Sequence, residues 1–283
     1  MKVYIIGIGL IGGSFAIDIK SAFKESEIFG IDQNNSHLQQ ALELGIIDHK
    51  AILEDINKAE VVIITIPVNS TLTILPRVLD LVPDDCLVID AGSTKQKLCA
   101  KVNDHKKRRN YLAAHPIAGT EFSGPKAAIA NLYRNKTNII CEVEKTAFKL
   151  QEKGLEIFSK LGMRIRYMDP ASHDKHIAYV SHLSHISSFM LGKTVIEKEK
   201  NEKDIFDMAG SGFASTVRLA KSSPAMWTPI FEHNKENVLE TLKEYISNLS
   251  WFQKLLEEDD FEKVYAEMEA ANRIKSILNG IDR

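Results

Sequence analysis

The sequence has few cysteines, no long apolar run and almost no net charge, and each absence excludes a class of proteins. Cys86, Cys99 and Cys141 are an odd number of cysteines without CxxC spacing, so neither a disulfide framework nor a cysteine zinc site is expected. Unpaired thiols fit the reducing cytoplasm, which is the predicted location. No run reaches the roughly 18 apolar residues of a membrane span. With 36 basic and 38 acidic residues, the charge of −2 gives no reason to expect nucleic acid or a membrane as a partner.

The overall composition is that of an ordinary globular protein. The 283 residues are 44% hydrophobic and 26% charged, which fits two folded domains and excludes a disordered chain. The apolar segment after Lys2, VYIIGIGLIGGSFA, resembles a signal peptide, but a tight turn explains its glycines better. We therefore expect a soluble two-domain protein.

The first half of the chain alternates between strand-like and helix-like segments. Short apolar runs rich in β-branched residues predict strands, and apolar residues at four-residue spacing predict helices. The expected strands are 3–8, 27–31, 61–66, 86–91, 111–114, 137–143 and 163–167, with helices at 12–24, around Leu38–Leu42 and at 146–161. This alternation predicts an α/β fold with a parallel, doubly wound sheet of the Rossmann type.

The second half changes character after Asp169-Pro170, a dipeptide that favours the start of a helix. From there on, apolar residues recur at helical spacing and no strand-like run appears. We predict a Rossmann-type domain over 1–168 and an all-α domain over 169–283. The long apolar helix face at 234–257 has few partners in a chain of this length, which favours a homodimer through this domain.

Residues 7–12, GIGLIG, match the pattern GxGxxG between the first strand and the first helix. The first glycine permits a tight turn, the second lets a pyrophosphate approach the backbone, and the third allows close packing of helix on strand. Asp32 ends the second strand and would bind the adenosine ribose hydroxyls, and Gln33-Asn34-Asn35 offers no arginine for a 2′-phosphate. The sequence thus predicts NAD binding. The predicted contacts are Gly7, Gly9, Leu10, Ile11, Gly12 and Asp32.

Polar residues follow the later strands at the edge where open α/β sheets bind ligands. The fourth strand leads into DAGSTK (90–95), and the fifth leads into HPIAGTEFSG (115–124). His115 therefore lies at a strand end on a rigid turn, and the near-neutral pKa of histidine suits proton transfer. By itself, such a histidine is more often structural than catalytic.

Several segments together resemble the prephenate/arogenate dehydrogenase family. They are GIGLIGGS, DAGSTK, HPIAGTEFSG, SHLSH (181–185) and GFASTVRLAKSSPAMW (212–227). The resemblance covers nearly the whole chain and is to the monofunctional type. It implies NAD-dependent oxidative decarboxylation of prephenate to 4-hydroxyphenylpyruvate and CO2 in tyrosine biosynthesis.

The resemblance also implies roles for individual residues. His115 matches the catalytic histidine that hydrogen-bonds the ring 4-hydroxyl of the substrate, and Ser93 matches a serine that supports this histidine and the nicotinamide. Thr120 and Glu121 match the lip of the substrate site.

Two further matches lie in the helical half. His185 matches a group near the substrate side chain, and Arg218 matches the group that binds its carboxylate. The family pattern usually reads SHLPH, and Ser184 replaces the proline here, which alters the local helix geometry and leaves the position of His185 less defined. A planar guanidinium suits bidentate contact with a carboxylate, in agreement with the role of Arg218.

No metal is predicted, since His182 and His185 are accompanied by neither HExxH nor a cysteine pair. His173 and His176 are expected at the surface or at a domain interface. Trp227 and Trp251 are expected to be packing residues.

Alternatives remain open at this point. The same chemistry on arogenate would yield tyrosine directly, and a non-catalytic NAD-binding protein would keep the glycine turn. A reductase of imines or 3-hydroxy acids on a similar frame is disfavoured by HPIAGTE.

Overall fold

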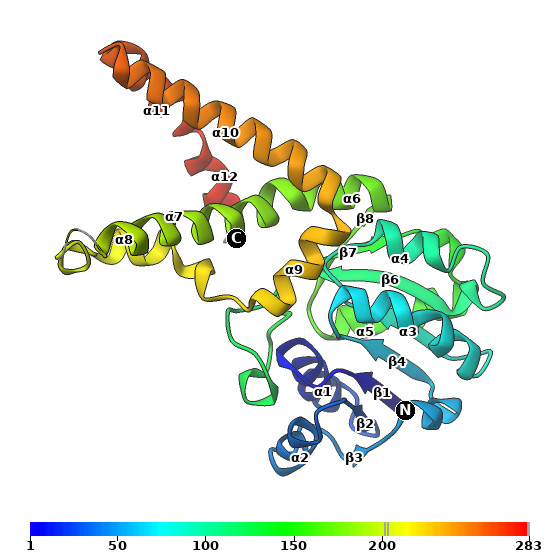
Figure 1. The fold of residues 1–283 in the computed structure, drawn as a ribbon. Coiled ribbons are helices and arrows are strands. Elements are labelled where there is room, and N and C mark those ends of the chain that lie inside the picture. Colours follow the sequence, from blue (N-terminus) through cyan, green and yellow to red (C-terminus); the bar gives the residue numbers. More distant parts are fainter. Residues whose placement is uncertain (201, 203, 282–283) are drawn as a thin grey trace. The chain divides into compact units, whose positions relative to one another are not determined.

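The computed structural model describes residues 1–200, 202 and 204–281 (Figure 1). Its strands are β1 (Lys2–Ile6), β2 (Glu27–Ile31), β3 (His49–Lys50), β4 (Val61–Ile64), β5 (Leu87–Asp90), β6 (Tyr111–Pro116), β7 (Thr137–Cys141) and β8 (Arg164–Met168). They form one sheet in the order β3-β2-β1-β4-β5-β6-β7-β8. The order reverses between β1 and β4, and this is where doubly wound sheets bind their ligands. The predicted α/β fold is confirmed.

The prediction of a wholly parallel sheet is wrong at one pair of strands. β6 and β7 run antiparallel, with His115 opposite Ile139, and β8 then pairs with β7 in parallel. A parallel return needs a crossover connection, usually a helix. The chain between Pro116 and Thr137 contains only a short 3-10 turn, Pro125–Ala127, so it returns antiparallel. The two-residue strand β3 was also missed, because His49 and Lys50 form no apolar run.

Helices cover both faces of the sheet. Those that follow or precede its strands are α1 (Leu10–Ala22), α2 (Asn35–Glu43), α3 (Val68–Leu81), α4 (Gln96–Lys101) and α5 (Phe148–Lys160). Buried apolar residues of α1, α2 and α5 pack on one face, and those of α3 and α4 pack on the other. Because both faces are covered, the central strands β1, β4 and β5 consist almost wholly of buried residues.

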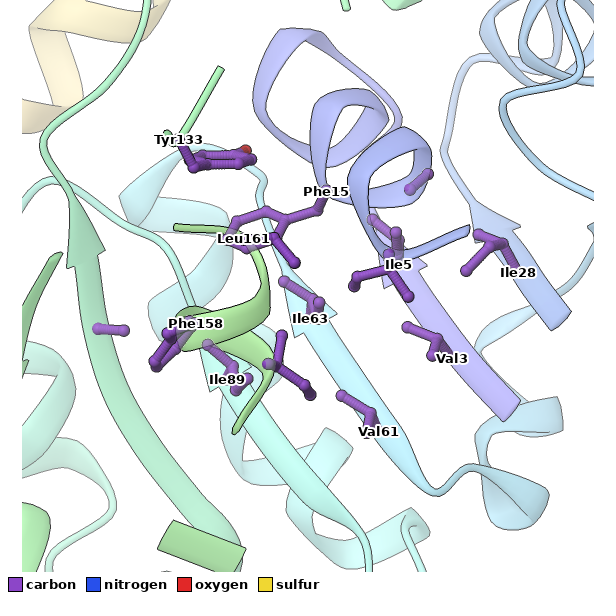
Figure 2. Close-up of a cluster of buried hydrophobic side chains, with 14 of the residues drawn as sticks. Val3, Ile5, Phe15, Ile28, Val61, Ile63, Ile89, Tyr133, Phe158 and Leu161 are labelled. Atoms are coloured by element: carbon purple, nitrogen blue, oxygen red, sulfur yellow. The ribbon is translucent and has the colours of Figure 1, made fainter. Parts of the chain in front are cut away.

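Figure 2 shows the core on the α1 and α5 face. Ile5, Ile63 and Ile89 project from neighbouring strands, and all three are inaccessible to solvent. Phe15 of α1 stacks on Tyr133 with their ring centroids 4.3 Å apart, and the Tyr133 hydroxyl donates to the carbonyl oxygen of Ile11. The irregular segment after β6 is thereby fixed against the first helix.

Among the described residues, the chain after β8 forms helices and no strand, as predicted. It continues as α6 (Pro170–Ile177), a π-helical turn at Ala178–His182, α7 (Leu183–Glu199), α8 (Ser211–Thr216), α9 (Pro224–His233), α10 (Lys235–Glu257), α11 (Phe261–Ala271) and α12 (Ile274–Ile281). The Asp169 side chain caps α6 by accepting from the Ser172 N–H at 2.9 Å.

Internal contacts divide the chain into two compact units, with the division between Lys235 and Glu236. All side chains of the site described below belong to the first unit. In the second unit, α10 and α11 expose apolar side chains, among them Ile246, Leu249 and Met268. No helix in the described part of the chain combines the length and apolarity that crossing a membrane requires.

Candidate active site

The glycine loop joins β1 to α1 by a turn that only glycine fits at two of its positions. Gly7 has φ of +96°, and its N–H donates to the Ile31 carbonyl at 2.7 Å. A Cβ at Gly12 would lie 2.0 Å from the Gly7 oxygen, so this glycine permits α1 to pack on the loop. A Cβ at Gly9 would meet no described atom within 4 Å. The space beside Gly9 is therefore open, which suits a pyrophosphate at the N-terminus of α1.

Asp32 lies at the carboxyl end of β2 and is tied to the same loop. Its carboxylate accepts from the Ile8 N–H at 2.9 Å through one oxygen and from the Asn34 N–H at 2.8 Å through the other. These bonds hold the carboxylate at the loop, half-buried, in the position that a ribose-binding acid requires. The residues predicted to bind the dinucleotide are thus together in space.

A buried ion pair holds the turn between β5 and α4. Lys95 and Asp90 are both inaccessible to solvent and form a short salt bridge. The Tyr111 hydroxyl also donates to Asp90, at 2.6 Å, and burial raises the pKa of this phenol well above its usual value. Lys95 Nζ further donates to the Ala114 carbonyl at 2.7 Å, which joins this turn to β6 just before His115. Ser93 is half-buried in the same turn, and the described residues show no hydrogen bond from it to His115.

His115 is buried at the end of β6, and its Nδ1 lies 2.8 Å from Nε2 of His173. The pKa of His115 is well below its usual value, first because burial disfavours the charged ring and then because a proton on His115 would be repelled by one on His173, by Lys95 and by one on His182. The expectation of a near-neutral pKa is therefore wrong. His115 is a neutral imidazole at physiological pH and can accept a proton.

His173 is not at the surface; as the interface alternative expected, it contacts the other predicted domain, through His115. It is buried in α6, and its Nδ1 lies 2.7 Å from Oδ1 of Asp174, which is also buried. The Asp174 carboxylate accepts the backbone N–H groups of Lys95 and Gln96 at 2.7 and 2.9 Å. A continuous hydrogen-bonded chain thus runs from His115 to the start of α4.

Aromatic rings and histidines group around Trp227 of α9. His185 stacks on the indole with centroids 3.5 Å apart, and His182 meets it edge-on at 5.9 Å. His185 Nδ1 donates to the Ser181 carbonyl at 2.9 Å, which leaves Nε2 as an acceptor. Burial lowers the pKa of both histidines, to about 4 for His182. Ser184, in the place of the usual proline, donates to the Val180 carbonyl at 3.3 Å and leaves the helix intact.

Arg218 and Glu121 form an ion pair at 3.3 Å. The Arg218 side chain is half exposed, and its positive charge reaches His185, whose pKa it lowers. Thr120 is exposed, and its hydroxyl accepts weakly from the Phe122 N–H. Two residues predicted to bind the substrate, Arg218 and Glu121, are thus in contact, and Arg218 links this pair to the group around Trp227.

The chain matches known proteins along nearly its whole length. Residues 15–167 match the family model for the nucleotide-binding domain of prephenate dehydrogenase, and residues 169–270 match the model for its dimerization domain. The chain belongs to the prephenate dehydrogenase family. A prephenate dehydrogenase of Bacillus subtilis is 32% identical over 93% of this chain and 72% of its own length. A prephenate dehydrogenase of Lactococcus lactis is 28% identical over 98% of this chain and 77% of its own length.

A solved structure supports the same assignment. The prephenate dehydrogenase of Aquifex aeolicus, determined with hydroxyphenyl propionate and NAD+, superposes with a TM-score of 0.90. The two chains are 31% identical, and the match covers 98% of each. The resemblance to the prephenate dehydrogenase family inferred from the sequence is confirmed.

Sequence reasoning missed several residues of this candidate site. His173, Asp174 and Asn234 carry no recognised pattern, and Asn234 donates to the Asp174 carbonyl at 2.6 Å. The pairing of Lys95 with Asp90 lies inside the DAGSTK segment but was not foreseen. The available signal was the adjacent His173-Asp174 pair, since histidine next to a carboxylate is a frequent arrangement at sites of proton transfer.

Proposed function

We propose that this protein is an NAD-dependent prephenate dehydrogenase that converts prephenate to 4-hydroxyphenylpyruvate and CO2 for tyrosine biosynthesis. The observation that carries the proposal is His115. In a chain of this family, His115 is a buried, neutral histidine at the end of β6, on the edge of the sheet that also carries the glycine loop. Such a group is suited to accept a proton from a substrate hydroxyl.

The residues present fit NAD. Gly7, Gly9 and Gly12 would let the pyrophosphate approach the backbone, with the N–H groups of Leu10 and Ile11 at the start of α1 facing it. Asp32 would accept the ribose hydroxyls and would repel a 2′-phosphate. When bound, NAD supplies the acceptor for the hydride that leaves the substrate ring.

The protein's own residues bind the substrate and accept one proton. His115 accepts the proton of the ring 4-hydroxyl, so that a carbonyl can form at that carbon. We assign Ser93, in the neighbouring turn, to the support of His115 and the nicotinamide on the family resemblance, since no direct hydrogen bond joins it to His115 among the described residues. Arg218 binds a substrate carboxylate through its planar guanidinium, and His185 lies near the side chain. Thr120 and Glu121 form the lip of the site. Loss of the ring carboxylate as CO2 leaves an aromatic phenol, which drives the reaction forward, and the scheme requires no metal.

The test mixes purified protein, NAD and prephenate and follows the absorbance of reduced nicotinamide. We expect steady reduction with NAD and much slower reduction with NADP. A flat trace from folded protein would overturn the proposal. Arogenate is the comparison substrate. A higher kcat/KM with arogenate than with prephenate would show that arogenate is the preferred substrate. We favour prephenate because the relatives that are 32% and 28% identical to this chain are prephenate dehydrogenases.

The proposal includes a homodimer formed through the helical part that follows a boundary near residue 168. It is supported by the match of 169–270 to a dimerization domain and by the exposed apolar side chains of α10 and α11. A monomer at micromolar concentration in sedimentation would contradict it. We also propose a cytoplasmic location, which the three buried free thiols favour.

A further inference from the structure

Three buried side chains form a hydrogen-bonded series that ends on the proposed base. His115 Nδ1 lies 2.8 Å from His173 Nε2, and His173 Nδ1 lies 2.7 Å from Asp174 Oδ1. The His173 and Asp174 side chains are each only 2% exposed. No role was foreseen for either residue, and neither belongs to the predicted site.

The donor and acceptor of each hydrogen bond in the series follow from Asp174, the residue at the end away from His115. The Asp174 carboxylate can only accept, and it already accepts two backbone N–H groups of the β5–α4 turn. His173 Nδ1 must therefore carry a proton and donate it to Asp174. In neutral His173, Nε2 is then a lone-pair acceptor, so the proton between the two rings belongs to His115 Nδ1. This assigns the lone pair of neutral His115 to Nε2.

We propose that His173, held by Asp174, is a positioning residue that fixes His115 in the tautomer whose Nε2 accepts the proton of the substrate hydroxyl. The inference extends the proposed function and rests on it. If the other tautomer were present, Nε2 would carry a proton and His115 could not act as the base.

The surroundings of Asp174 fit such a role. Its two oxygens are held by separate backbone donors, and its own carbonyl accepts from Asn234 Nδ2 at 2.6 Å. The carboxylate therefore has little freedom to turn away from His173. When His115 accepts a proton, the new positive charge lies one ring away from this carboxylate, which stabilises it.

Two substitutions of similar polarity separate positioning from packing. In His173→Gln, the amide oxygen reaches the place of Nε2 and can still accept from His115. In His173→Asn, the shorter amide ends near the place of Nδ1 and leaves His115 Nδ1 without a partner. His176→Gln is the matched control, because His176 is exposed on the same helix.

We expect His173→Asn to lower kcat about 100-fold, with KM for prephenate and NAD nearly unchanged, since only the base is affected. His173→Gln should recover kcat to within about 10-fold of wild type, and His176→Gln should match wild type. NAD binding and the thermal midpoint are measured for every variant to confirm folding.

The outcomes distinguish the inference from the proposed function. Wild-type protein that does not reduce NAD with prephenate overturns the function itself. Active wild type together with an equally active His173→Asn variant overturns the positioning role. Equal losses of kcat in His173→Asn and His173→Gln, or a change in KM alone, also overturn the positioning role, because a structural role predicts either result.

Discussion

The glycine loop and the histidine cluster (His115, His173, His182 and His185) both lie at the carboxyl edge of the sheet. The loop is made of backbone groups, whereas the cluster is made of side chains. The loop at residues 7–12 offers backbone groups from one contiguous turn, and the Asp32 carboxylate is hydrogen-bonded to that turn. The cluster presents side chains from segments far apart in the sequence: His115 lies beside His173, and His185 stacks on Trp227. We therefore expect substitutions in the two regions to change different measured properties. Loop substitutions should act on folding or cofactor affinity, whereas cluster substitutions should act on turnover or substrate affinity.

The largest expected effect is the loss of the proposed base. His115→Asn should lower kcat about 10²–10⁴-fold with prephenate binding little changed, because the variant lacks the group that accepts the proton. Steady-state kinetics against prephenate measures this, with NAD binding as the check on folding. His185→Asn is the companion variant. If it abolishes turnover while His115→Asn remains active, the base lies on α7 and the assignment to β6 is wrong.

Arg218→Ala should come next, with a different signature. Losing a hydrogen bond to a charged group costs about 1.5–3 kcal/mol, which corresponds to a rise in KM for prephenate of roughly 10- to 150-fold. We expect kcat to change little, because the carboxylate is bound in the ground state and the transition state alike. Arg218→Lys is the control that keeps the charge but loses the planar fork, so it should be intermediate. A fall in kcat alone would contradict the binding role.

The sequence predicted those parts of the fold and site that depend on local pattern. The strands of the first half were found because buried β-branched runs mark them, and the glycine loop was found because its role is carried by consecutive backbone groups. Asp32 followed from its place at the end of the second strand. These features need no knowledge of which distant segments meet.

The remaining features depend on tertiary contacts. His173 was assigned to the surface or an interface because its position in a helix does not say which face is buried, and only packing places it against His115. The low pKa of His115 has the same origin, since burial is its largest cause. The direction of β7 could not be read from its apolar pattern, which is the same for parallel and antiparallel pairing at a covered face.

The glycine loop itself offers a matched pair of substitutions. Gly12→Ala places a methyl group 2.0 Å from the Gly7 oxygen, so α1 must shift, and we expect a loss of about 1–3 kcal/mol in the free energy of unfolding. Gly9→Ala meets no described atom, so the fold should be retained while the methyl group enters the space proposed for the pyrophosphate. Denaturant unfolding and NAD titration measure the two effects. Equal losses of stability in both variants would show that the loop is structural throughout.

The smallest effect concerns the acid limb of activity. His115 must be neutral to accept a proton, and burial, followed by repulsion from His173, Lys95 and His182 when these are protonated, holds its pKa well below its usual value, despite the nearby Asp174. The active form therefore persists as the pH falls through 6.5, and kcat/KM for prephenate should decline only at distinctly lower pH. The measurement is the pH profile of kcat/KM in wild type and in His115→Asn. An inflection near pH 6.5 that disappears in the variant would mean that the His115 ring is more accessible to solvent than its buried position indicates.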